Sequence, residues 1–89
     1  MNLDNFKIVL VKWDDASSTS DNISLKSAQE LTPVPRANVG YLVYESNELI
    51  KICCGFYLED DSIREADHTL IILKGMITSL EQLNEMREV

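Results

Sequence analysis

The segment LIKICCGFYL, residues 49–58, decides the fold of this chain. Taken as a strand, its alternate residues give one wholly apolar face, made of Ile50, Ile52, Cys54, Phe56 and Leu58. The opposite face is mixed, with Leu49, Lys51, Cys53, Gly55 and Tyr57. We therefore expect Cys54 in the core and Cys53 exposed or at an interface. Phe56 should be the most sensitive core position of the strand, and Gly55 is expected to mark a bulge or a close approach of another strand.

Further strands are expected on both sides of this segment, at residues 6–13, 39–45 and 68–73, with a short fifth strand at 76–79. None of the apolar runs alternates cleanly, so both faces of the sheet carry apolar groups. A chain of this size has little material to cover two faces. The excess predicts a closed small barrel, self-association, or both.

A short helix is expected after the polar loop at residues 16–22, because Ser24 or Asn22 can cap it and Thr32-Pro33 ends it. Such a helix would plug one end of a barrel. Pro33-Val34-Pro35 is expected to be a stiff spacer rather than a strand.

Two loops and a second helix complete the outline. Residues 46–48 are short enough for a hairpin loop, and residues 59–67 read as a longer acidic loop. Near the C-terminus, Ser79 and Gln82 fit a capping box that would start a short helix, and the end past residue 84 is expected to fray. The expected fold is mainly β with one or two short helices: a small, partly open antiparallel β-barrel of SH3-like or Sm-like kind.

Length and charge limit the function classes. The 89 residues predict a single domain over 1–89, with a net charge of −7 from 8 basic and 15 acidic side chains. Such a charge argues against a broad nucleic-acid groove, since those surfaces neutralise phosphates with Lys and Arg. There is no signal-like N-terminus and no apolar stretch of membrane-spanning length, which predicts a cytoplasmic protein without a membrane partner.

The sequence offers no recognisable reaction centre. Cys53 and Cys54 are neighbours, so an ordinary disulfide between them is geometrically implausible, and no second pair exists to complete a four-ligand zinc site. His68 is the one histidine, and it is expected on the surface. We therefore expect no catalytic residue, no metal and no cofactor.

Three segments together resemble a group of small uncharacterised proteins encoded by bacteriophages and prophages. They are VKWDDA at 11–16, VGYLV at 39–43 and IILKGMI at 71–77. The likeness extends from about Ile8 to Leu83, and such relatives often have a proline where this chain has Leu73. It implies a phage or prophage origin and carries no catalytic residues.

This origin favours a non-enzymatic binding protein, one that inhibits host antiphage defence by sequestering a nucleotide-type ligand or by occupying a host protein. A small-barrel nucleic-acid-binding protein and a phage structural or assembly protein are the alternatives. An anionic ligand needs positive charge and a flat face for stacking, and the candidates for these are Trp13, Arg36, Tyr41, Tyr44 and Lys74. The remaining partner expected is a second copy of the chain, in a homo-oligomer of the bacterial host cytosol.

Overall fold

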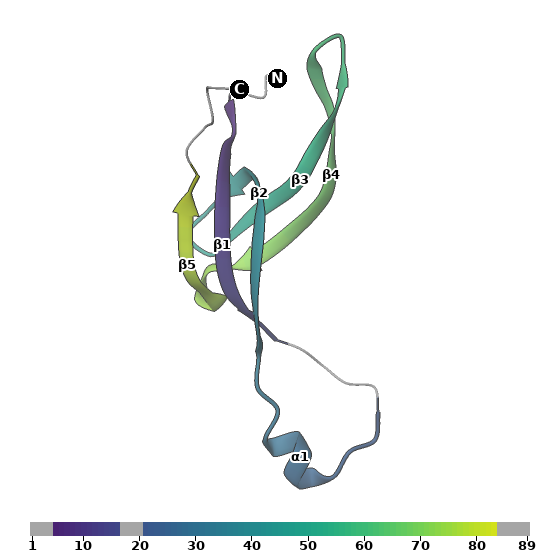
Figure 1. Cartoon of the computed structure of the whole chain (residues 1–89), viewed down its shortest axis with the longest axis vertical. Helices are drawn as coiled ribbons and strands as arrows, with labels where there is room; N and C mark the ends of the chain where they lie inside the picture. The colour runs from purple at the N-terminus through teal and green to yellow at the C-terminus, as the bar shows by residue number, and fades with distance from the viewer. Residues whose placement is uncertain (1–4, 17–20, 84–89) are drawn as a thin grey trace.

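The computed structural model describes residues 5–16 and 21–83, and this part of the chain forms one antiparallel sheet of five strands (Figure 1). The elements in chain order are β1 (Lys7–Asp15), helix α1 (Leu25–Gln29), β2 (Val34–Glu45), β3 (Leu49–Glu59), β4 (Ser62–Leu73), the 3-10 turn η2 (Lys74–Met76) and β5 (Ile77–Gln82). The strand order is β4-β3-β2-β1-β5, so within the described residues β4 and β5 are the edges and the sheet is not closed. The prediction of a mainly β fold is confirmed.

The core lies on the inner face of this sheet. Its buried residues come from three strands: Val9, Val11 and Trp13 of β1, Ile50 and Ile52 of β3, and Ile72 of β4. β2 separates β1 from β3 in the sheet, yet these side chains form a single cluster. The sheet must therefore be strongly bent, and Figure 1 shows β3 and β4 crossing β1 and β2 at an angle.

The opposite surface of the sheet, here called the outer face, is apolar and exposed. Strand pairing places its residues in register, with Leu10 opposite Val39, Tyr44 opposite Lys51 and Lys51 opposite Ile71. The large apolar side chains exposed on it are Ile8, Val39, Tyr44, Ile71 and Leu73. The expected second apolar face therefore exists, and the described residues leave these five side chains uncovered.

Helix α1 forms as expected but does not plug the sheet. The Ser24 hydroxyl caps it by accepting a hydrogen bond from the Ser27 backbone N–H at 3.1 Å. Every residue from 21 to 37 is exposed, and Figure 1 shows α1 well away from the strands. The reason is the ladder between β1 and β2, which continues to Asp15 and Val34 and so carries the connecting segment beyond the end of the core. No helix among the described residues has the length and apolarity to span a membrane.

The prediction of a spacer at residues 33–35 is wrong in part, because Val34 and Pro35 belong to β2. Pro35 lies opposite Asp14 near the last rung of the ladder. A proline lacks the N–H that an interior rung requires, but the end of a strand tolerates it.

The prediction of an acidic loop at residues 59–67 is also wrong. Glu59 pairs with Ser62, so a two-residue turn at Asp60 and Asp61 joins β3 directly to β4. Both turn residues have positive φ, 52° and 63°. Two-residue hairpin turns need this backbone, usually with Gly or Asn, and Asp can adopt it. Because the turn contains two acidic residues and no glycine, the sequence does not predict the hairpin.

The C-terminal helix predicted from Ser79 and Gln82 is wrong within the described residues. These residues lie in β5, where Ser79 is opposite Lys12 and Gln82 is opposite Val9. Pairing with the exposed edge of β1 satisfies the backbone groups that the capping box would have served. The fifth strand is therefore longer than expected, and residues 84–89 lie outside the described part of the chain.

The two cysteines exchange the places expected for them. Cys53 is 1% exposed and Cys54 is exposed, although Ile50 and Ile52 are buried as predicted. β2 pairs with β3 only as far as Cys53, and beyond it β3 has only β4 beside it (Figure 1). Strict alternation placed Cys54 in the core, but the core ends where the β3–β4 hairpin leaves the rest of the sheet.

The close approach of strands expected at Gly55 is found instead at Gly40 of β2. A Cβ atom at Gly40 would lie 2.7 Å from the backbone oxygen of Cys53, whereas no atom of the described residues lies within 4 Å of one at Gly55. The missing side chain at Gly40 therefore lets β2 and β3 pack together at the centre of the sheet.

Candidate functional site

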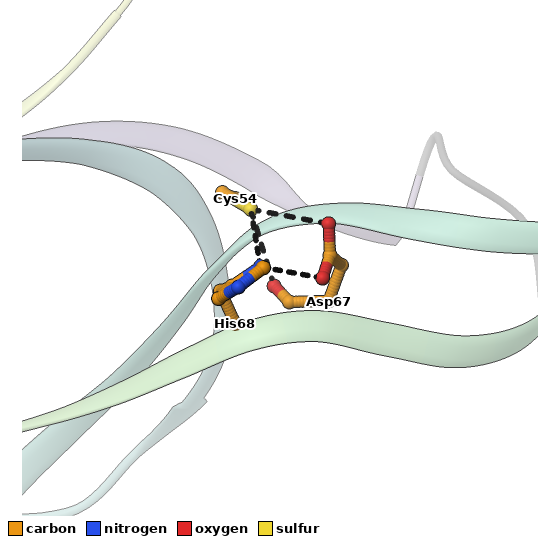
Figure 2. Close-up of side chains that lie close together, drawn as sticks. All are labelled: Cys54, Asp67 and His68. Atoms are coloured by element: carbon orange, nitrogen blue, oxygen red, sulfur yellow. Dashed lines mark hydrogen bonds and ion pairs between the residues drawn. The ribbon is translucent and has the colours of Figure 1, made fainter.

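Three chemically reactive side chains converge at the base of the projecting β3–β4 hairpin. Cys54 lies on β3, and Asp67 and His68 are neighbours on β4 (Figure 2). The β3–β4 register is known on both sides of the site, because Gly55 lies opposite Asp67 and Cys53 lies opposite Thr69. The two strands thus bring Cys54 level with His68.

An irregular backbone at His68 allows this convergence. Successive side chains of a strand normally point to opposite faces, so Asp67 and His68 should diverge. His68 has a φ of 48°, in the left-handed region that a β-strand does not use. Figure 2 shows the two side chains turned toward each other and toward Cys54.

The polar atoms of the three side chains lie within contact distance. The Asp67 Oδ1 atom is 2.6 Å from the His68 Nδ1 atom, and the Cys54 thiol donates to Asp67 Oδ2 at 3.5 Å or to the Asp67 carbonyl at 3.4 Å. The Cys54 Sγ atom is 3.8 Å from His68 Nδ1. One sulfur, one nitrogen and one oxygen all lie within 4.8 Å of one another.

This geometry does not suit a thiol nucleophile. In a catalytic triad the base faces the nucleophile with one ring nitrogen and its orienting carboxylate with the other. Here both Cys54 and Asp67 face the same nitrogen, Nδ1 of His68. Partial desolvation, followed by the hydrogen bond and the negative charge of Asp67, raises the pKa of the Cys54 thiol above its ordinary value of 9.0. At neutral pH the thiol therefore stays protonated and is a poor nucleophile.

A second site lies at the end of the β1–β2 ladder, beside the start of β5. It is a pocket of about 340 Å³ lined by Lys12, Trp13, Asp14, Pro35, Arg36, Ala37 and Thr78. Trp13 is 6% exposed and belongs to the core cluster, near the end of β1. Its indole N–H donates to the Asn38 side-chain oxygen at 2.8 Å, which fixes the ring in the wall of the pocket.

Arg36 is held over this wall by two contacts. Its guanidinium carbon lies 5.5 Å from the centre of the Trp13 ring, within range of a cation–π interaction. One of its terminal nitrogens lies 3.1 Å from the Asp15 carboxylate. Two of the five candidate residues, Trp13 and Arg36, are therefore neighbours in the structure.

The other three predicted site residues lie elsewhere. The Tyr41 ring packs at 4.9 Å from that of Phe56, and the Tyr44 ring lies 4.7 Å from the Lys51 ammonium. Lys74 begins η2 and forms an ion pair of 2.7 Å with a carboxylate, that of Glu45. None of the three lines the pocket at Trp13, so the five predicted residues do not form one site.

The Cys54 cluster was not anticipated from the sequence. Cys54 is separated from Asp67 and His68 by more than ten residues, and their alignment depends on the two-residue turn at Asp60 and Asp61. Reading that acidic pair as a hairpin turn would have placed Cys54 level with His68. Nothing in the sequence predicts the left-handed backbone at His68, and this backbone brings Asp67 into the cluster.

Comparisons with known proteins add no further identification. No protein-family model matches the chain, and no similar curated protein or solved structure is found.

Proposed function

We propose that this chain is a non-enzymatic binding protein of bacteriophage or prophage type, built on an SH3-like half-open barrel. The order of elements supports this fold: a strand, a long excursion, three strands joined by short turns, and a 3-10 turn leading to a last strand at the opposite edge. Its role is to capture a nucleotide-type ligand used by host antiphage defence and hold it without conversion.

The observation that carries the proposal is the placement of Arg36 at the mouth of the Trp13 pocket. A guanidinium stacked on an indole and tethered by a carboxylate is fixed in direction, so it loses little freedom when it binds an anion. Lys12 supplies a second positive charge to the lining, and Pro35 and Ala37 supply apolar surface. Asp14 and Asp15 limit the net charge, which favours a small ligand over a nucleic-acid strand.

Calorimetric titration of the intact protein with linear and cyclic nucleotides tests this capture. We expect binding of at least one member, weakened by added salt and by Arg36→Ala. Arg64→Ala is the matched control, because Arg64 is also an exposed arginine paired with a carboxylate, that of Glu59 at 3.6 Å, but lies on the β3–β4 hairpin. No binding, or equal losses from the two variants, would contradict the role of the Trp13 pocket.

The same incubations test the absence of turnover. Chromatography of the nucleotides afterwards should return each compound unchanged. Steady conversion that Cys54→Ser or His68→Asn abolishes would replace the binding protein with an enzyme.

We further propose that the protein works as a homo-oligomer. Two apolar surfaces remain uncovered in the described chain: the outer face, and the segment around α1, where Ile23, Leu25 and Leu31 are exposed. Within one chain they lie apart, but a second copy can cover one with the other, and symmetric homo-oligomers are common among soluble assemblies.

Light scattering coupled to size exclusion at tens of micromolar protein tests this assembly. We expect a mass of twice 10.1 kDa or more, and a shift toward the monomer in Val39→Asp and Leu25→Asp. A mass near 10.1 kDa for the unaltered chain would refute self-association.

A further inference from the structure

We propose that Cys54, Asp67 and His68 form a zinc site, with water in the fourth coordination position. This reverses the expectation that the chain binds no metal, which rested on counting cysteine and histidine alone. The zinc site does not depend on the Trp13 pocket, because it lies on β3 and β4, whereas the pocket is built from β1, β2 and β5.

The spacing of the three donor atoms matches the needs of tetrahedral zinc. Zinc–ligand bonds of about 2.3 Å to sulfur and about 2.0–2.2 Å to nitrogen or oxygen place the sulfur about 3.6 Å from each of the other two donors. In the structure the Cys54 Sγ atom is 3.8 Å from His68 Nδ1 and 3.5 Å from Asp67 Oδ2. A metal ion can therefore bridge these atoms with little movement of the sulfur.

One contact has to open. The Asp67 oxygen that lies 3.5 Å from the sulfur is Oδ2, whereas the other oxygen, Oδ1, is in direct contact with His68 Nδ1 at 2.6 Å. Tetrahedral zinc separates a nitrogen from an oxygen ligand by about 3.4 Å, so Nδ1 must leave Oδ1 to bind a metal beside Oδ2. The His68 side chain is 84% exposed and that of Asp67 is 31% exposed. Both can rotate by the required amount without disturbing the core, and zinc replaces the proton that now joins them.

The mixture of donors selects the metal. Magnesium and calcium prefer sites made wholly of oxygen, and a thiolate disfavours them. Sulfur, imidazole nitrogen and carboxylate oxygen are the three ligand types that zinc takes in proteins. The site therefore selects zinc over the common alkaline-earth ions.

The backbone supports a dedicated site. A left-handed conformation at a non-glycine residue costs free energy, and such residues are concentrated at functional sites. At His68 this conformation has one evident effect, which is to point the imidazole and the Asp67 carboxylate at the same place. A regular strand would have separated the two ligands.

Zinc binding releases protons from the ligands. Zinc displaces the proton of the Cys54 thiol, and it binds the neutral imidazole through Nδ1 with the ring proton on Nε2. Each zinc bound to a chain with neutral His68 thus releases one proton, and a chain with protonated His68 releases two. Oxidation states do not change.

Competition for zinc with a chromophoric chelator tests the site in the intact, reduced protein. We expect one zinc per chain, with affinity lowered about tenfold or more in Cys54→Ser and in His68→Asn, since even residues that only support ligands change affinity by that factor. Asparagine tolerates the left-handed backbone, so His68→Asn removes the imidazole while keeping the turn. Cys53→Ser is the matched control and should bind as the unaltered protein does, because Cys53 is buried and outside the cluster.

Cobalt provides a second readout. The Co²⁺ protein should show the visible bands of a tetrahedral ion together with a sulfur-to-cobalt charge-transfer band, which Cys54→Ser removes. Equal zinc affinity in the unaltered protein and Cys54→Ser, with urea midpoints showing both folded, would overturn the proposal. A cobalt spectrum of an octahedral ion without the sulfur band would also overturn it, since it would mean binding by surface carboxylates.

Discussion

Replacing Gly40 by alanine tests the central packing of the sheet with a single methyl group. Its Cβ atom would lie 2.7 Å from the Cys53 carbonyl oxygen, 3.3 Å from the Cys53 carbonyl carbon and 3.4 Å from the Ile52 Cβ atom. The first two are backbone atoms of the neighbouring strand and cannot rotate away. β2 and β3 would have to separate by several tenths of an ångström at the rung joining Tyr41 to Cys53.

The expected loss of stability follows from this overlap. Extra methyl groups forced into packed interiors typically cost about 1–3 kcal/mol. A chain of 89 residues has a free energy of unfolding of roughly 4–13 kcal/mol at the usual value per residue, so the loss is a large share of the total. It corresponds to a fall in melting temperature of about 4–8 °C for each kcal/mol.

Urea unfolding followed by Trp13 fluorescence measures the effect, because this single tryptophan is buried and reports on the core. Gly55→Ala is the matched control in the adjacent strand, where a Cβ meets no atom of the described residues within 4 Å and φ is not positive. It should be neutral or more stable by about 0.4–1 kcal/mol, through the entropy of the unfolded chain. Equal stability of Gly40→Ala and Gly55→Ala would refute the close approach of β2 and β3.

Three further predictions concern the core, the thiols and the α1 segment. Ile50→Ala should cost about 2–5 kcal/mol and more than Phe56→Ala, because Ile50 is fully buried whereas Phe56 is partly exposed; similar urea midpoints would contradict this. An alkylating reagent should modify Cys54 in the native state and Cys53 only on unfolding, and the Cys54 rate should keep rising above pH 9.0 since the pKa of its thiol is raised; faster native labelling of Cys53 would oppose the assignment. Leu25→Ala should change the urea midpoint by less than about 0.5 kcal/mol in dilute protein, because Leu25 is 75% exposed, and a larger loss would mean that α1 contributes to the core.

Strand positions were largely predictable, because apolar, β-branched runs locate β1 and β3 and the short loop at 46–48 separates β2 from β3. The burial of the β3 side chains was predictable only in part. Alternation places Ile50 and Ile52 correctly, but it fails at Cys53, which is buried opposite Tyr41, and at Cys54, beyond the last pairing with β2. Burial depends on which strands are adjacent, and a single strand's pattern does not contain that information.

The candidate sites show the same division. The chemistry of Trp13 and Arg36 makes them candidates for a ligand site, and the register makes them neighbours across the ladder. Tyr41 and Lys74 are candidates on the same chemistry, but Tyr41 packs against Phe56 and Lys74 pairs with Glu45. Residue type determines which interactions a side chain can make, whereas strand register determines which side chains lie close enough to act together.

The exposed segment between β1 and β2 has a consequence for how this protein can evolve. The β1–β2 ladder runs to its last rung at Asp15 and Val34, and α1 buries no residue. The free energy of closing a loop rises slowly with its length, so residues 16–33 could be shortened to a tight turn or lengthened at small cost. The sheet is thus a fixed frame, and the segment can vary without disturbing the core. Related chains could therefore diverge fastest in this segment while keeping the same five strands.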